Sequence, residues 1–153
     1  MTKATNRPIT GSAATATVPS NVWTHVAATY NIADGMWNLY MNGVNVGSLD
    51  MANGLVPENV SIQHAAIGSA LTSTGLPAGF FNGKIDEVRI WNYARSATDI
   101  LNNYQNELSS GAGLLGRFGF NENCDTIINN SVSGGANGVA KSFQSANPPS
   151  LTT

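Results

Sequence analysis

Alternating apolar and polar positions, interrupted by short turn signals, run through much of the chain and predict β-strands. Residues 22–30 (VWTHVAATY) and 36–41 (MWNLYM) are rich in aromatic and apolar side chains, and Asp34-Gly35 lies between them. A further apolar run over 44–49 follows Asn42-Gly43. Asn-Gly and Asp-Gly readily take the positive φ values of tight type I′ hairpin turns. The pattern therefore predicts two consecutive antiparallel hairpins.

The rest of the chain repeats this alternation of strands and turns. Further turn dipeptides are Asn53-Gly54, Asn82-Gly83 and Asn137-Gly138. Further predicted strands cover residues 60–67, 80–91, 114–120, 126–132 and 139–143. Short strands separated by turns about every 8–12 residues are typical of β-sandwiches and barrels rather than of βαβ units.

Residues 84–91 (KIDEVRIW) carry two adjacent acids whose placement matters for function. Strict alternation along a strand directs Asp86 and Glu87 to opposite faces. Both faces also carry large apolar side chains, so each acid needs a partner once the strand is covered. In the simplest interpretation Asp86 accepts backbone hydrogen bonds, and Glu87 pairs with Arg89 or Lys84.

One helix is predicted beyond residue 96. Ser96 followed three residues later by Asp99 is close to a capping box, in which a side chain satisfies the free N–H groups of the first turn. An apolar stripe follows at Ile100, Tyr104 and Leu108, and glycines at 111 and 113 end the pattern. Because the stripe is narrow, we expect the helix on the edge of the sandwich.

Composition removes several classes of function. Only 10% of residues are charged and the net charge is −2, which excludes the basic footprint of a nucleic-acid-binding protein. No apolar run approaches the roughly 20 residues of a membrane span, so no membrane insertion is expected. The chain is 42% hydrophobic and holds 19 Asn and 16 Gly, which suits packed strands and tight turns rather than disorder.

Four segments, taken together and in order, resemble the bacterial laminin G-like domains of the concanavalin A-like lectin/glucanase superfamily. They are residues 23–30 (WTHVAATY), 38–44 (NLYMNGV), 81–92 (FNGKIDEVRIWN) and 113–122 (GLLGRFGFNE). The resemblance implies an all-β fold, an antiparallel jelly-roll β-sandwich with one short helix on its edge. It also implies a secreted bacterial protein, extracellular or at the cell surface, in which such domains serve as lectin-like accessory modules.

The order of these segments departs from the family. A strand similar to residues 117–122 usually opens such a domain, but here it follows the helix that usually closes one. We predict a sandwich over 13–144, with 1–12 as a linker or edge segment and 145–153 as a linker. Residues 114–143 are then a permuted opening segment, the start of a second domain, or strands shared between copies. The last two alternatives leave unpaired sheet edges through which a homo-oligomer can form.

The resemblance also suggests a structural Ca²⁺. In related sandwiches, an Asp similar to Asp86 helps to hold the ion near the opening strand, where Asn121, Glu122 and Asp125 lie in this chain. Ca²⁺ takes six to eight oxygen ligands, which carboxylates, carbonyls and waters can supply. The alternative is that Asp86 serves only as a hydrogen-bond acceptor.

Carbohydrate binding needs an aromatic face for the sugar ring and amides or carboxylates for its hydroxyls. Trp37, Asn38 and Tyr40 lie in one short hairpin, with His25 and Gln63 as further polar candidates. Trp37 shares its face with Leu39 and Met41, which favours Trp37 as a core residue and Tyr40 as the exposed ring. Polysaccharide or a glycosylated surface is the expected partner.

Catalysis is disfavoured. Retaining glycoside hydrolases direct two carboxylates into one cleft, about 5–5.5 Å apart, and adjacent strand residues such as Asp86 and Glu87 cannot do so. The leading prediction is therefore a non-catalytic binding module, carbohydrate-binding or adhesive, within a larger protein. The alternatives are an assembly unit that completes its sandwich by strand exchange and, last, a glycoside hydrolase.

Overall fold

The computed structural model describes residues 10–12, 16–51, 65–72, 74–122 and 126–140. The chain divides into two compact units. The first comprises Met1–Gly83 with Trp91–Leu108, and the second comprises Lys84–Ile90 with Ser109–Thr153. No helix among the described residues is long and apolar enough to cross a membrane.

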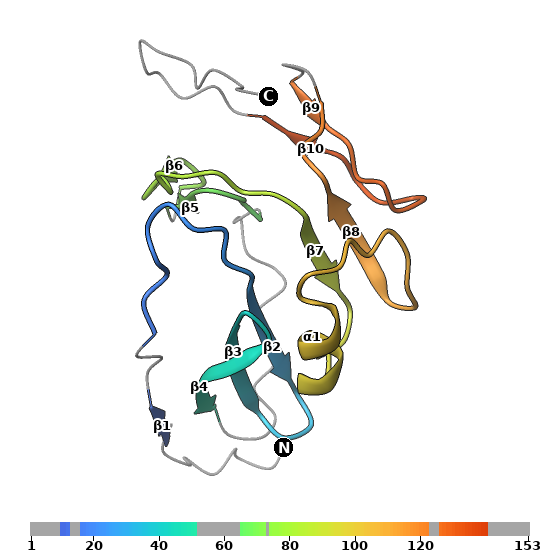
Figure 1. Cartoon of the computed structure of the whole chain (residues 1–153). Coiled ribbons are helices and arrows are strands. Elements are labelled where there is room, and N and C mark those ends of the chain that lie inside the picture. The colour runs from blue at the N-terminus through green and yellow to red at the C-terminus, as the bar shows by residue number, and fades with distance from the viewer. Residues whose placement is uncertain (1–9, 13–15, 52–64, 73, 123–125, 141–153) are drawn as a thin grey trace, which may run out of the picture. The chain divides into compact units, whose positions relative to one another are not determined.

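The first unit is built on a four-stranded antiparallel sheet with the order β1-β4-β3-β2 (Figure 1). Its strands are β1 (Thr10–Ser12), β2 (Val26–Asn31), β3 (Met36–Met41) and β4 (Val44–Asp50). The predicted strand 36–41 is confirmed at both ends. The predicted strand 22–30 begins only at Val26, because the ladder to β3 starts there with the pair Val26–Met41.

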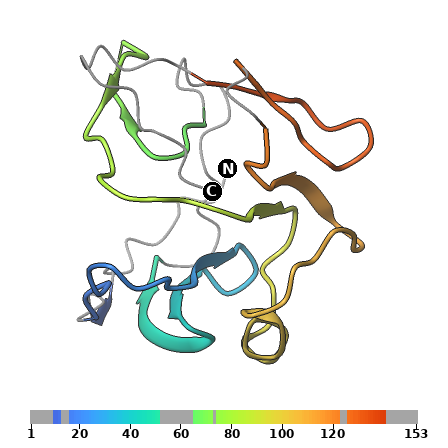
Figure 2. The ribbon, with the colours of Figure 1, turned by 45° about the horizontal axis from the view of Figure 1, so that its top comes forward.

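The two hairpin turns differ from one another. At the β3–β4 turn, Asn42 and Gly43 have φ values of 49° and 82°, as a type I′ turn requires. Figure 2 shows the ribbon from a second direction, with the strands of this hairpin in cyan. The β2–β3 turn is wider than predicted, because Asn31 pairs with Met36 and leaves four residues in the loop. There only Gly35 has a positive φ, 73°, while Asp34 accepts the Met36 N–H through Oδ1 (2.9 Å).

The helix α1 (Ala97–Asn103) begins as predicted and ends early. Ser96 Oγ accepts the Asp99 N–H (3.0 Å) and donates to Asp99 Oδ2 (2.7 Å). Ile100 is buried at 5% exposure, but the helix stops at the Tyr104 C-cap rather than continuing to Leu108. Leu101 and Tyr104 lie against Gly43, so α1 packs on the end of the β3–β4 hairpin.

Two short strands complete the first unit. They are β5 (Ala70–Leu71) and β6 (Pro77–Ala78), which pair as an antiparallel hairpin. The predicted strand 60–67 has no counterpart over its described residues 65–67, and the remainder lies outside the described residues, as does Asn53-Gly54.

The second unit is centred on β8 (Leu114–Phe118), whose residues are mostly buried. It pairs with β7 (Val88–Trp91) of the same chain, and β9 (Ile127–Ile128) pairs with β10 (Gly138–Val139). The predicted strands 114–120 and 126–132 are shorter than expected, and residues 141–143 of the predicted strand 139–143 lie outside the described residues. The predicted strand 80–91 shrinks to β7, because Glu87 takes a left-handed φ of 51° that ends regular alternation.

Mostly antiparallel strands, short connections and a single short helix make the described fold all-β, as predicted. The predicted linker residues 1–9 and 145–153 lie outside the described residues, whereas 10–12 form β1. The division of the chain into domains therefore stays a prediction.

Candidate functional site

An aromatic pair, the exposed Trp37 and the half-buried Tyr30, lies on one face of the four-stranded sheet. Tyr30 and Trp37 are direct cross-strand partners in β2 and β3. Their ring centroids are 5.1 Å apart and their planes differ by 25°, which is a stacked arrangement. The Trp37 side chain is 39% exposed. A flat indole held in place by a second ring is the kind of surface on which an apolar sugar face can stack.

The β2–β3 loop, which follows Tyr30 in the sequence, is closed by hydrogen bonds of its own side chains and backbone. Asn31 Nδ2 donates to Asp34 Oδ2 (2.9 Å), and Asn31 Oδ1 accepts the Ala33 N–H (3.1 Å). The Gly35 N–H donates to the Asn31 carbonyl (2.8 Å) and closes the loop. The loop is therefore held by its own side chains.

Two of the predicted sugar contacts lie on the opposite face. Tyr40 is 6% exposed and belongs to the core, so the prediction of an exposed Tyr40 and a buried Trp37 is wrong. The side chains of β3 alternate between two faces as predicted. The face that the protein covers is the one with Tyr40, and not the apolar face with Trp37. Asn38 Oδ1 accepts from Ser48 Oγ (2.7 Å) and from Asn45 Nδ2 (3.1 Å), which forms a polar cluster away from Trp37.

The remaining predicted contacts do not join either group. The His25 N–H donates to Asn42 Oδ1 (2.9 Å), at the hairpin end opposite the β2–β3 loop. The His25 ring lies 6.1 Å from that of Tyr104. Gln63 lies outside the described residues. The structure thus distributes His25, Trp37 and Asn38 over three places. It adds Tyr30, which the hairpin register could have revealed as the partner of Trp37.

The acids proposed for Ca²⁺ are largely engaged by the protein. Asp86 Oδ1 accepts the Glu87 N–H (2.8 Å), and Glu122 Oε1 accepts the Asn129 N–H (2.7 Å). Asn121 Nδ2 lies beside Gly119, where Glu87 Oε1 also lies. No group of three or more His, Cys, Asp or Glu side chains that could hold a metal occurs in the described part of the chain. Asp125 is outside that part, so Ca²⁺ stays a prediction.

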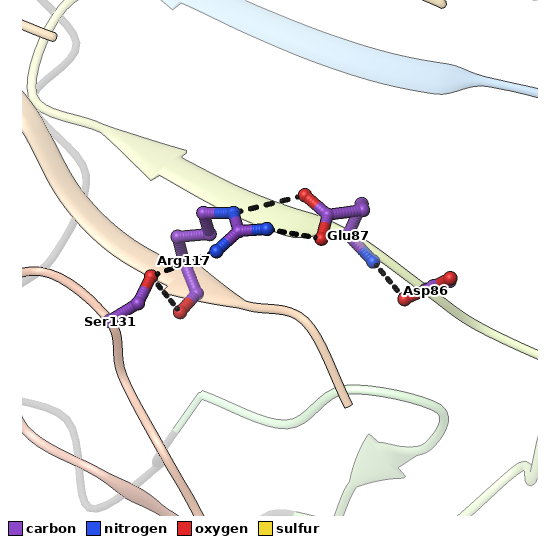
Figure 3. A network of polar contacts seen from close by, with 4 residues as sticks. All are labelled: Asp86, Glu87, Arg117 and Ser131. Atoms are coloured by element: carbon purple, nitrogen blue, oxygen red, sulfur yellow. Dashed lines mark hydrogen bonds and ion pairs between the residues drawn. The ribbon is translucent and has the colours of Figure 1, made fainter. Parts of the chain in front are cut away.

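Glu87 has a partner that the sequence did not suggest. Arg117 in β8 donates through Nη2 to Glu87 Oε1 (2.6 Å) and through Nε to Glu87 Oε2 (3.1 Å) (Figure 3). The predicted pairing with Arg89 or Lys84 is therefore wrong. The left-handed backbone at Glu87 redirects its side chain, which alternation along a continuous strand could not anticipate.

A small hollow of about 250 Å³ lies in the second unit. It is lined by Ser109, Ser110, Gly111, Leu114, Ser131, Val132 and Ser133. Hydroxyl groups can contact a polar ligand there, but no aromatic or charged side chain lines the hollow. The aromatic pair is therefore the stronger candidate for a carbohydrate.

Comparison with known proteins identifies the family. The model of the concanavalin A-like lectin/glucanases superfamily matches residues 1–101. The chain belongs to this superfamily. The superfamily match includes the complete β2–β3–β4 hairpin pair and most of α1, and the segment 114–143 lies outside it. No curated protein matches the chain.

Two solved structures resemble this superfamily member. One is a candidate carbohydrate binding protein from Bacteroides ovatus, with 26% identity and a TM-score of 0.59 over 76% of this chain. The other is an S-layer domain-containing protein from Clostridium thermocellum, with 27% identity and a TM-score of 0.46 over 57% of this chain. The chain spans only 34% and 41% of those two chains, respectively.

Proposed function

We propose that this chain is a non-catalytic carbohydrate-binding module of a larger protein. The observation that carries the proposal is the exposed Trp37 ring, stacked on Tyr30, in a superfamily that includes lectins. The similarity to the candidate carbohydrate binding protein of Bacteroides ovatus supports the same partner class. Polysaccharide or a glycosylated surface is the proposed ligand, and a secreted bacterial or cell-surface location is the proposed setting.

The engagement of the central acids supports a binding role over hydrolysis. Both carboxylate oxygens of Glu87 accept hydrogen bonds from Arg117, so this acid is committed to an ion pair. Asp86 accepts the backbone N–H of Glu87 itself. A glycosidase needs two carboxylates free to meet the glycosidic bond from its two sides.

Affinity electrophoresis in gels cast with neutral polysaccharides tests this function. We expect the chain to be retarded by at least one polysaccharide, and Trp37→Ala to weaken retardation about five- to tenfold, because a lost ring contact costs about 1–1.5 kcal/mol. Trp23→Ala is the matched control, since Trp23 is 67% exposed and lies outside the aromatic pair. Parallel gels with a chelator test the Ca²⁺ prediction. Absence of retardation on every polysaccharide would contradict the proposed function.

A specific observation also favours the second candidate, an assembly unit. The sheet face that carries Trp37 leaves Val26 61%, Leu39 39% and Val44 60% exposed. Exposed apolar rows of this kind are typical of surfaces that another polypeptide covers. Light scattering over a range of concentrations tests this candidate, with Leu39→Lys as the variant. A wild-type chain that stays monomeric at every concentration would exclude it.

A further inference from the structure

Three Asn-Gly dipeptides lie in the described part of the chain, at residues 42, 82 and 137. Such a dipeptide is chemically labile, because the glycine nitrogen can attack the carboxamide carbon of the asparagine. Glycine has no Cβ to hinder this approach, and its backbone reaches conformations closed to other residues. The reaction needs a side chain and a following peptide group that can move. The structure therefore determines which of the three dipeptides can react.

Asn42 is held at both its backbone and its side chain. Asn42 Oδ1 accepts the His25 N–H (2.9 Å), and the Asn42 N–H donates to the His25 carbonyl (2.9 Å). Gly43 is buried, and Leu101 and Tyr104 of the α1 region pack against its Cα. These contacts fix the carboxamide in place and leave the turn no room to rearrange.

Asn137 is also held. Its Oδ1 accepts the Asn130 N–H (3.0 Å), which directs the carboxamide toward the neighbouring loop. Gly138 pairs with Ile128 in the β9–β10 ladder, so its peptide group belongs to a strand. Attack by the Gly138 nitrogen would require this side-chain contact and the short ladder to open together.

Asn82 has none of these hydrogen bonds, and Gly83 belongs to no strand ladder. The Phe81 ring lies beside Gly83, but Phe81 is 56% exposed, so its side chain can turn into solvent without unfolding the chain. Asn82 and Gly83 are both exposed and lie outside the helix and strands. Within the described residues, neither forms a hydrogen bond or an ion pair. We propose that Asn82 is the preferred site of spontaneous deamidation among these three dipeptides, so that the chain acquires a modified residue at this position with time.

The reaction is balanced with water as its only co-reactant. The deprotonated Gly83 nitrogen bonds to Asn82 Cγ, the Cγ–Nδ2 bond breaks, and ammonia leaves with the displaced proton. Water then opens the resulting succinimide at either carbonyl and gives aspartate or isoaspartate. No oxidant or reductant takes part. Each event adds one negative charge to a chain whose net charge is −2.

The position of Asn82 gives this modification a structural consequence. The chain passes from the first compact unit to the second between Gly83 and Lys84. Isoaspartate carries its former side-chain carbon in the main chain, so it lengthens the connection at this junction. Phe80 and Phe81, which precede the site, are 55% and 56% exposed, and the new carboxylate would lie beside them.

Peptide mapping by mass spectrometry during incubation at mildly alkaline pH tests the proposal on the full chain. We expect Asn82 to convert at least about tenfold faster than Asn42 or Asn137, since each of these must first lose hydrogen bonds of about 1 kcal/mol apiece. In the urea-unfolded chain the three rates should become similar. Equal native rates, or an unreacted Asn82, would overturn the proposal.

Two variants connect the modification to a single residue. Both variants are made in an Asn53→Gln background, which removes the Asn-Gly dipeptide that lies outside the described residues. In this background Asn82→Gln should abolish the acidic form that isoelectric focusing detects after incubation. Asn92→Gln is the matched control, because Asn92 is also exposed but precedes Tyr93 rather than glycine. The Asn92 variant should accumulate the acidic form at the wild-type rate. Persistence of that form in Asn82→Gln would place the reaction elsewhere and contradict the proposal.

Discussion

Arg117 and Glu87, thirty residues apart in the sequence, form a two-point ion pair with Nη2–Oε1 and Nε–Oε2 distances of 2.6 and 3.1 Å. Arg117 is 8% exposed and the Glu87 side chain 26%. The third guanidinium nitrogen, Nη1, donates to Ser131 Oγ (3.3 Å). The planar guanidinium thus donates to Glu87 on one edge and to Ser131 on another. These hydrogen bonds connect β8 to the turn before β7 and to the loop after β9.

Replacement of Arg117 by Met should destabilise the protein. The variant leaves Glu87 half-buried without its partner, and removal of one member of a buried pair costs about 3–5 kcal/mol. Because Glu87 keeps some access to water, we expect a smaller loss, about 2 kcal/mol in the free energy of unfolding. Urea denaturation measures it. Lys84→Met, which removes an exposed cation from the same unit, is the control and should change little.

Gly43→Ala should destabilise the β3–β4 turn more than an ordinary glycine replacement. Gly43 has a φ of +82°, and an added Cβ would lie 3.0 Å from Leu101 Cα, Leu101 Cδ1 and Tyr104 Cδ1. We expect a loss of about 2–3 kcal/mol, of which about 1 kcal/mol is the cost of left-handed backbone. Gly75→Ala isolates the backbone term, because Gly75 has a φ of +77° with nothing within 4 Å. Equal losses in the two variants would argue against the packing of α1 on this turn.

The N-cap of α1 gives a further prediction. Ser96→Ala removes the acceptor of the Asp99 N–H and should lower the free energy of unfolding by about 1 kcal/mol. Ser96→Asp supplies another capping oxygen and should restore most of that loss. Thermal unfolding followed by circular dichroism compares the two. Loss of stability in both variants alike would mean that Ser96 contributes something other than its cap.

Neighbouring residues were enough to predict some of the local structure, but not the width of the β2–β3 turn or the end of α1. The positive φ values at Asn42 and Gly43 and the cap at Ser96 depend on neighbouring residues alone. The exposure of Trp37 and the burial of Tyr40, which are opposite to the prediction, show what neighbouring residues cannot decide. Alternation separates two faces of a strand, but the elements that cover one of them come from distant parts of the chain.

The acidic pair shows a second limit. The prediction for Asp86 and Glu87 assumed a continuous strand, and one left-handed residue at Glu87 was enough to change the side chain's direction. The true partner, Arg117, is separated by the helix and its flanking loops, so no local spacing rule could identify it. The pairing of Tyr30 with Trp37 is partly predictable, because the register of the hairpin follows once the length of its loop is known.

Asn130 organises the loop after β9, and its replacement gives the last prediction. Its Oδ1 accepts the N–H groups of Arg117 and Val132, both at 3.0 Å. Its Nδ2 donates to the carbonyls of Leu115 (3.2 Å) and Ala136 (3.3 Å). One carboxamide thus satisfies four backbone groups. Asn130→Ala should cost about 2–3 kcal/mol, because partly buried donors and acceptors lose their partner.

The neighbouring residue provides a matched control for Asn130. Asn129 is exposed, and the hydrogen bond it makes to Glu122 uses its backbone N–H, which Asn129→Ala keeps. We therefore expect Asn129→Ala to stay within about 0.5 kcal/mol of the wild type in urea denaturation. Asn130→Asp retains the acceptor for Arg117 and Val132 but turns an oxygen toward two carbonyls, so it should recover only part of the loss. Equal stability of the two alanine variants would mean that the loop does not depend on this carboxamide.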